Sequence, residues 1–448
     1  MARLKEYNGH YCESEYEYAF IGFLEAEGWK YSSGNNISRV TKRDVLIADD
    51  FKKFIADTNP DLTEDEVIQI YDNVRLVGAE SDFATLHKVY GWMVNGVQFT
   101  TQDGLPRMIP LIDFDNWDKN IFRVVNQFTV EYTNNGQKEN RRPDVLLFVN
   151  GMPLCVIELK NPADANATIY DAWEQINIRY WRDIPHLLHY CPLACISDGV
   201  KTRLGTVRTP YEHFYAWRRV NEGDAVSTLP FAETETMIKG VYAPERFMEI
   251  FRDYIYFQDS IYDSDEVEII CRYPQFFAAK LLKQSIVNSV VTRSGKGGTY
   301  FGATGCGKTY TMAFLARQLA LRCTDIPEIG SPTIILIVDR DELQKQGSKL
   351  FTKSKEFLNL GEVSVVKNRT QLRQELGARQ SGGFYICTIQ KFCDRKDDKI
   401  GLINDRQNII CFSDEAHRTQ LEHSKKIQFS KDADENMKAM VSKPYAKV

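Results

Sequence analysis

The sequence lacks the paired cysteines that would indicate a disulfide framework or a zinc site. Its ten cysteines include no C-x-x-C pair, and the C-x₃-C formed by Cys191 and Cys195 has no matching second half. All ten are therefore expected to be reduced thiols. The chain also lacks an apolar run of about 18 residues, and its first residues lack the apolar segment of a signal peptide. These absences predict a cytoplasmic protein that does not insert into a membrane.

An excess of positive charge is missing as well. The 448 residues carry a formal net charge of −5, so the overall field does not attract nucleic acid. Any contact with DNA must therefore come from a local basic surface. The length is sufficient for about two or three domains, and a hydrophobic content of 43% is ordinary for a globular protein.

A phosphate-binding pattern, G-x-x-x-x-G-K-[ST], occurs at residues 302–309. Its fixed positions and the glycine between them are Gly302, Gly305, Gly307, Lys308 and Thr309. Residues 299–301 are expected to form a short strand before it, and apolar residues at helical spacing predict a helix over 308–322. Lys308 would reach the β- and γ-phosphates, and Thr309 would bind Mg²⁺. The alternative is a glycine-rich turn without a ligand.

Apolar runs after this pattern are typical of parallel strands buried on both faces. They lie at 333–338, 384–388 and 408–413. The last run is followed by Asp414, Glu415 and, after an alanine, His417. We assign the nucleotide's metal to Asp414 and the general base to Glu415, and His417 could link hydrolysis to a DNA-contacting surface; an ordinary acidic turn is the alternative. Gln275, upstream, could bind both edges of adenine and select ATP.

A predicted hairpin in the N-terminal half carries two carboxylates and a lysine. Its strands and turn are expected at 143–149, 153–160 and Asn150-Gly151. A period of two puts Glu158 and Lys160 on one face, and Asp144 can face them across the hairpin. Asp144 and Glu158 are ligands suited to Mg²⁺, while Lys160 can orient a nucleophile or stabilise charge on a phosphate. The pattern therefore predicts metal-dependent phosphodiester hydrolysis, with a solvated strand face as the alternative.

Helices are expected on either side of this hairpin. Ser14 and Glu17 form a capping box at the start of the first helix. Capping is the whole role of Glu17 in one interpretation, and in the other Glu17, or Glu15, presents a carboxylate to a site assembled later in the chain; both interpretations remain open. The second helix, over 168–182, carries Gln175 and Tyr180, which are our candidates for DNA contact. A solvated amphipathic helix is the alternative for each.

Together these motifs resemble the restriction (R) subunit of type I restriction-modification systems. The resemblance rests on Glu17, Asp144, Glu158, Lys160, and the segments 273–275, 302–309, 388–392 and 414–420. It implies an α/β chain with a PD-(D/E)xK nuclease domain at 1–230, a helical linker at 231–264 and the first RecA-like domain of a superfamily 2 motor at 265–448. It also implies ATP and Mg²⁺ as cofactors, ATP-driven translocation on double-stranded DNA, and modification and specificity subunits as partners.

The chain departs from this family in two respects. The glutamine and tyrosine after the nuclease lysine usually have three residues between them, whereas Gln175 and Tyr180 have four. No second RecA-like array follows His417, so we expect a truncated subunit that binds ATP, hydrolyses it poorly and does not translocate. The competing hypotheses are a stand-alone DNA repair nuclease-helicase and a nucleotide-dependent DNA-binding module with an inert nuclease site.

Overall fold

The structure is a computed structural model whose described residues form two compact units, the first ending at Tyr273 and the second beginning at Pro274. The described residues are 13–78, 80–161, 168–227, 229, 231–258, 267–303, 305–338, 349–359, 361–392, 402–414, 426–431 and 437–442. Side chains are described up to Asp414 only. Both units are of the α/β class that the sequence predicts, and they are treated separately below.

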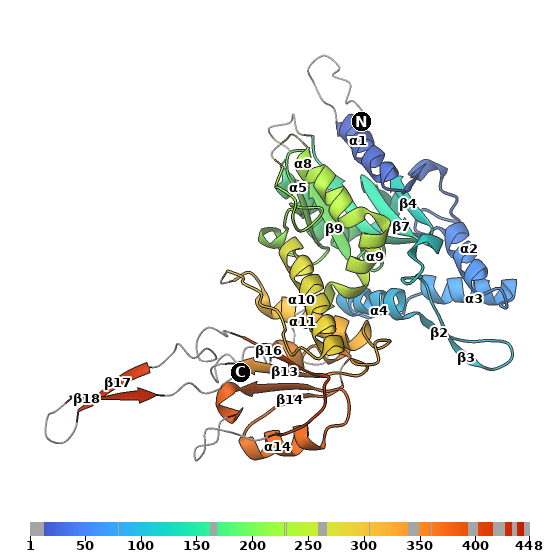
Figure 1. The fold of residues 1–448 in the computed structure, drawn as a ribbon. Coiled ribbons are helices and arrows are strands. Elements are labelled where there is room, and N and C mark those ends of the chain that lie inside the picture. The colour runs from blue at the N-terminus through green and yellow to red at the C-terminus, as the bar shows by residue number, and fades with distance from the viewer. Residues whose placement is uncertain are drawn as a thin grey trace. The chain divides into compact units, whose positions relative to one another are not determined.

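A mixed sheet forms the centre of the first unit (Figure 1). In spatial order its strands are β1 (Lys30–Ser33), β4 (Phe122–Asn126), β7 (Val145–Val149), β8 (Met152–Leu159), β9 (Leu193–Ser197) and β10 (Thr202–Thr206). The pairs β1–β4 and β8–β9 are parallel, and the other neighbours are antiparallel. The start of β7 and the end of β8 therefore lie at the same edge, which is where the predicted carboxylates are carried.

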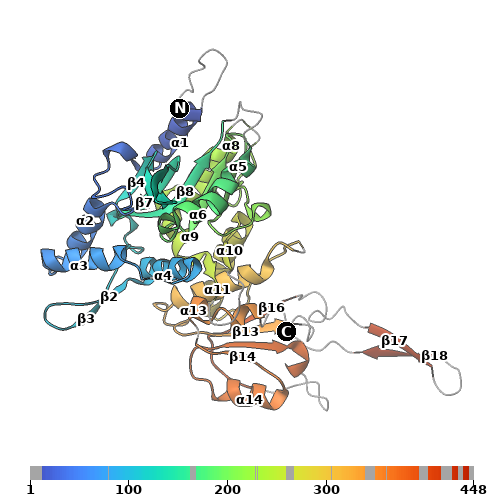
Figure 2. The ribbon, with the colours of Figure 1, turned by 180° about the vertical axis from the view of Figure 1, so that it is seen from behind.

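The hairpin between β7 and β8 follows from its two-residue turn. Asn150 and Gly151 have φ angles of 50° and 76°, as a type I′ turn requires at both central positions. The strands on either side are buried along their whole length. They are apolar on both faces because helices cover the sheet on both sides: α8 lies over it in Figure 1 and α6 lies over it in Figure 2.

The helices of the first unit are mostly short. Their bounds are α1 Glu13–Ala26, α2 Ala48–Thr58, α3 Glu64–Arg75, α4 Asp82–Asn95, α5 Ile169–Glu174, α6 Trp181–Asp183, α7 Pro185–Leu188, α8 Ala232–Met237 and α9 Pro244–Asp253. Two-stranded ribbons complete the unit: β2 Val97–Thr100 with β3 Pro106–Ile109, β5 Val130–Asn134 with β6 Gln137–Arg141, and β11 Ile255–Phe257 with β12 Glu268–Ile270. The strand β6 was not predicted from the sequence.

The described part of the segment predicted as a helical linker, 231–258, belongs to the first unit instead. It contains α8, a π-helical turn at Ile238–Tyr242, α9 and β11. Trp29 donates a hydrogen bond of 2.7 Å to the carbonyl of Tyr242, and Phe247 is fully buried and packs against the Trp29 ring. These apolar contacts make the segment part of the fold of the first unit.

The second unit contains a parallel sheet, as the three apolar runs predict. In spatial order its strands are β14 (Val363–Val365), β15 (Phe384–Thr388), β13 (Thr333–Val338) and β16 (Ile409–Ser413). Its described helices are α10 Tyr273–Thr292, α11 Lys308–Leu321, α13 Lys355–Leu358 and α14 Arg369–Ala378, and an antiparallel ribbon joins β17 (Lys426–Lys431) to β18 (Met437–Ser442). α10 begins with Tyr273, the last residue assigned to the first unit.

The strand predicted at 299–301 is wrong. Residues 297–303 form no regular structure, and Phe301 is 96% exposed. A strand of this length depends on a neighbouring strand and on burial of its apolar side chains; here Phe301 has no burial and glycines flank the run. Among the described residues, no helix is both long enough and apolar enough to span a membrane.

Candidate functional site

The predicted nuclease residues Asp144, Glu158 and Lys160 come together at one edge of the first unit's sheet. Asp144 directly precedes β7, and its Oδ2 accepts a hydrogen bond of 2.9 Å from the amide of Leu159 in β8. Glu158 is fully buried near the end of β8, and Lys160 follows that strand. The hairpin thus fixes the two carboxylates and the ammonium group through its own backbone pairing.

Gln175 and Tyr180, on the neighbouring helix, both donate hydrogen bonds to the Glu158 carboxylate. The Gln175 Nε2 donates to Glu158 Oε2 at 2.7 Å, and the Tyr180 hydroxyl donates to Glu158 Oε1 at 2.6 Å. The same Gln175 amide contacts the Tyr180 hydroxyl at 2.9 Å, and Lys160 Nζ donates to Gln175 Oε1 at 3.1 Å. Tyr180 is buried, so its polar group faces the carboxylate and not the solvent.

A π-helical turn explains how residues with four others between them meet on one face. Residues Gln175–Tyr180 form this turn, between α5 and α6. A π-helix repeats at i+5, where an α-helix repeats at i+4, so it places Gln175 and Tyr180 one above the other. The extra residue relative to the family's usual spacing is therefore absorbed by the backbone, and both side chains still reach Glu158.

The surroundings of Glu158 favour a bound cation. Burial holds the pKa of Glu158 well above its usual range, and the charge of Asp144 and a hydrogen bond with Asp144 add to this effect. Lys160 and the Tyr180 hydroxyl act in the opposite direction. Two carboxylates in a low-dielectric site destabilise each other's charge, and a divalent cation between them would relieve that repulsion.

The donor set suits Mg²⁺ better than a metal held in a protein cage. Within the described ranges, no group of three or more His, Cys, Asp or Glu side chains could hold a metal ion. Mg²⁺ commonly binds to one or two carboxylates and keeps several waters or phosphate oxygens as its other ligands. Asp144 and Glu158 therefore fit this ion.

Glu17 lies near the same sheet edge. Its Oε1 accepts a hydrogen bond of 2.6 Å from Asn126 Nδ2, and its Oε2 accepts one from Gln127 Nε2. The backbone N–H of Gln127 donates to the backbone carbonyl of Asp144 at 3.0 Å. Helix α1 begins at Glu13, so Ser14 lies inside the helix and is not its N-cap. These contacts favour the second interpretation, in which Glu17 is directed at the site.

Several residues that support the site were missed from the sequence. Asn126 ends the buried strand β4 and Gln127 follows it; two consecutive side-chain amides at a strand end were the available signal. The carbonyl of Ser197 accepts the Lys160 amide at 2.8 Å, and its hydroxyl belongs to a buried ring of hydrogen-bonded hydroxyls. The ring is formed by Tyr16, Ser197, Thr202 and Thr234. Its members are far apart in the sequence, so no local pattern identifies it.

The phosphate-binding pattern lies at the N-terminus of α11 in the second unit. Gly305 and Gly307 have φ angles of 79° and 81°, which glycine adopts without strain. A Cβ at Gly307 would lie 2.4 Å from the Gln275 amide nitrogen, and that nitrogen donates to the Gly307 carbonyl at 3.0 Å. Lys308 and Thr309 occupy the first turn of α11. Gln275, which was predicted to bind adenine, is buried against this loop.

The predicted metal carboxylate of the motor, Asp414, directly follows β16. Its amide donates to the carbonyl of Ile337 in the adjacent strand β13 at 2.8 Å. Ligands of open parallel sheets bind at the carboxyl ends of the strands, and Asp414 is at such an end. The predicted general base Glu415 and its neighbour His417 lie outside the described residues.

Comparison with protein families identifies matches in both units. Residues 11–213 match the type I restriction enzyme R protein N terminus, and residues 274–445 match the SWI2/SNF2 ATPase family. The chain is 30% identical over 440 residues to the type I restriction enzyme HindI endonuclease subunit of Haemophilus influenzae, covering 94% of this chain and 40% of that protein. Both predicted modules thus find independent counterparts.

Two further relatives carry similar names. The putative type I restriction enzyme MjaIXP endonuclease subunit of Methanocaldococcus jannaschii is 30% identical over 433 residues, covering 90% of this chain and 39% of that protein. A type I restriction enzyme endonuclease subunit of Staphylococcus aureus, SauCOLORF180P, is 26% identical over 317 residues, covering 70% of this chain and 30% of that protein. The chain spans at most about two fifths of these relatives' lengths.

Proposed function

Because the chain belongs to the R protein family of type I restriction enzymes, we propose that it combines a Mg²⁺-dependent DNA endonuclease with the first RecA-like domain of an ATP-driven DNA translocase. The proposed domains are a nuclease that ends near Tyr273 and a motor domain that begins at Pro274. Modification and specificity subunits are the proposed partners, and double-stranded DNA is the proposed substrate. The names of the relatives and the order of the two matched families support this proposal.

The single observation that best supports a nuclease is the convergence of Asp144, Glu158 and Lys160 at one sheet edge. Asp144 and Glu158 would hold the Mg²⁺, which when bound neutralises charge on the scissile phosphate and lowers the pKa of an attacking water. Lys160 would orient that water or stabilise the developing charge. Gln175 and Tyr180 are proposed to position Glu158, in place of the DNA contact expected from the sequence.

In the second unit, Lys308 and Thr309 are proposed to bind the nucleotide's phosphates and its Mg²⁺, helped by the exposed N–H groups at the start of α11. Asp414 would hold the same ion from the sheet, and Glu415 is proposed as the general base for hydrolysis. Gln275 is proposed to recognise adenine after releasing its hydrogen bond to Gly307. ATP is therefore the proposed nucleotide.

The test is cleavage of plasmid DNA by the complete restriction complex, with and without ATP. Asp144→Ala is expected to abolish cutting and spare ATP hydrolysis, because it removes a metal ligand of the nuclease alone. Lys308→Ala is expected to abolish both, because the motor no longer binds nucleotide. Normal cutting by the Asp144→Ala complex would refute the nuclease assignment, and normal ATP hydrolysis by Lys308→Ala would refute the motor assignment.

A further inference from the structure

We infer that the loop 39–44, together with the β5–β6 ribbon, is a basic surface that binds the phosphate backbone of duplex DNA next to the nuclease site. The inference rests on the proposed nuclease function and adds the surface that holds its substrate. We define the basic ledge as the exposed side chains of Lys42, Arg43 and Arg142. Neither the motif pattern nor the family matches assign these residues.

The basic ledge lies on, or contacts, the segment that leads into Asp144. Arg142 stands two positions before Asp144, at the end of the β5–β6 ribbon. The carbonyl of Lys42 accepts a hydrogen bond of 3.0 Å from the amide of Glu131 in β5. The guanidinium of Arg39 stacks over the Phe128 ring, with its central carbon 3.8 Å from the ring centroid. The loop is thus attached to the chain that leads into the catalytic carboxylate.

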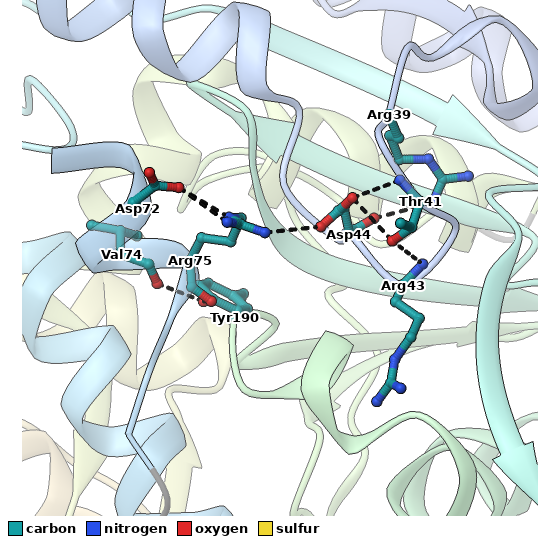
Figure 3. Close-up of polar contacts among 8 residues, drawn as sticks. All are labelled: Arg39, Thr41, Arg43, Asp44, Asp72, Val74, Arg75 and Tyr190. Atoms are coloured by element: carbon teal, nitrogen blue, oxygen red, sulfur yellow. Dashed lines mark hydrogen bonds and ion pairs between the residues drawn. The ribbon is translucent and has the colours of Figure 1, made fainter. Parts of the chain in front are cut away.

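The loop is held in shape by a carboxylate that faces inward (Figure 3). Asp44 Oδ2 accepts hydrogen bonds of 2.8 Å and 3.1 Å from the Thr41 amide and hydroxyl, and Oδ1 pairs with Arg75 at 3.5 Å. Arg39 donates to the Asp44 carbonyl at 3.2 Å. Figure 3 shows the Arg43 guanidinium turned away from both Asp44 and Arg75. The loop backbone that carries Arg43 is therefore already ordered, so binding needs to order only the Arg43 side chain.

The charges of the basic ledge are available to a ligand. Within the part of the chain that the structure describes, the side chains of Lys42, Arg43 and Arg142 make no ion pair or hydrogen bond, although, after burial, the charge of Arg43 helps to lower the pKa of His186. Neighbouring carboxylates already have other partners. These pairs are Asp44 with Arg75, Glu131 with Lys138, and Asp183 with Arg141 and Arg182.

A polyanion is the partner that this surface fits. The whole chain carries a net charge of −5, so unpaired cations on the segments that lead to the proposed nuclease site would provide a local attraction that the overall field does not. Contacts from lysine and arginine to phosphates supply affinity and orientation without reading sequence. This agrees with a subunit whose partner, in the proposed complex, recognises the DNA sequence.

The experiment is fluorescence anisotropy of a labelled DNA duplex with the 448-residue chain, in EDTA and at several salt concentrations. Arg43→Gln/Arg142→Gln is compared with a control of equal charge change, Lys53→Gln/Lys119→Gln. Lys119 precedes β4, at the opposite end of the strand from Asn126, and Lys53 is an exposed lysine of α2. Thermal unfolding verifies that all the variants are folded.

Each phosphate contact contributes about 0.9 to the slope of log affinity against log salt. We therefore expect the ledge variant to lower that slope by about 2 and to weaken binding about 10- to 100-fold at low salt, with the control unchanged. Unchanged affinity and an unchanged salt slope in the ledge variant would overturn the inference. This holds even if the variant fails to assemble with partner subunits, because the surface would then bind protein and not DNA.

Asp144→Ala separates failure of this inference from failure of the proposed function. It should bind the duplex at least as tightly as the native chain, and the complex that contains it should not cut plasmid DNA. If the ledge variant binds and cuts DNA normally while Asp144→Ala does not cut, the inference about the ledge is refuted and the nuclease assignment stands. If the Asp144→Ala complex cuts plasmid DNA normally, the nuclease assignment is refuted, whatever the result for the ledge variant.

Discussion

A single buried carboxylate gives a residue-scale prediction about pH. Glu268 in β12 is buried, and neither of its carboxyl oxygens has a hydrogen-bond partner among the described residues. Burial raises its pKa well above the usual value, with nearby Thr206 and Arg208 acting against the rise. The fold therefore favours the neutral form, and this contribution to stability is present below a pH of about 4.5 and is lost as the pH rises through the folded-state pKa.

Glu268→Gln keeps the shape of this side chain and cannot ionise. We expect it to match the native chain near pH 4 and to be more stable at pH 8, by on the order of 1–3 kcal/mol. The measurement is urea unfolding across this pH range, with the exposed Glu25→Gln as the control. A stability difference that does not grow with pH would contradict the assignment of Glu268 as an uncompensated buried acid.

The residue scale also shows what spacing in a sequence can identify. Asp144, Glu158 and Lys160 were predicted because a two-residue turn and a period of two determine where a hairpin puts its side chains. Asn126 and Ser197, which support the site from other strands, were not predicted. Their partners are Glu17 and Lys160, and such pairs depend on strand order, which local patterns do not encode.

Tight turns allow an element-scale prediction with an internal control. Gly151 and Gly136 both close two-residue hairpins and have φ angles of 76° and 79°. A Cβ at Gly151 would lie 2.2 Å from the carbonyl oxygen of Ile47, whereas one at Gly136 meets nothing within 4 Å. We expect Gly136→Ala to cost about 1 kcal/mol from backbone strain, and Gly151→Ala to cost roughly 3 kcal/mol or more because the clash adds to it.

The measurement is the free energy of unfolding of each variant in urea. Equal losses for Gly151→Ala and Gly136→Ala would mean that the contact between the hairpin and the segment before α2 is loose. The amide of Ile47 donates to the Gly151 carbonyl at 2.8 Å. This hydrogen bond holds the two segments together, so we expect them to leave no room for a Cβ at Gly151. A stable Gly151→Ala would therefore remove the explanation for glycine at this turn.

The strands and helices also differ in how well the sequence predicted them. Long apolar runs such as 333–338 and 384–388 gave correct strands because burial on both faces leaves an unmistakable composition. The short run 299–301 was wrong because three residues carry too little apolar surface to identify a strand. Helical periodicity, which assumes 3.6 residues per turn, did not predict the π-helical turn at Gln175–Tyr180; the only sign of it in the sequence was the one extra residue relative to the family's usual spacing.

At the scale of the whole molecule, the division at Tyr273 and Pro274 predicts two separate responses to ligands. A ligand that binds only the folded state raises stability by about 2.7 kcal/mol at 100 times its Kd. ATP analogue should therefore raise the melting temperature of the second unit only, and Lys308→Ala should abolish that shift. Mg²⁺ without nucleotide should raise the melting temperature of the first unit only, and Asp144→Ala should abolish that shift.

Differential scanning calorimetry of the 448-residue chain resolves these responses, because each unit has its own core and should unfold as its own transition. The two variants serve as each other's controls: Asp144→Ala should keep the full response to nucleotide, and Lys308→Ala should keep the full response to Mg²⁺. A single transition that nucleotide shifts would mean instead that the two units unfold as one cooperative body. The nuclease would then sense the nucleotide through the fold itself, and the motor would not need translocation to signal to it.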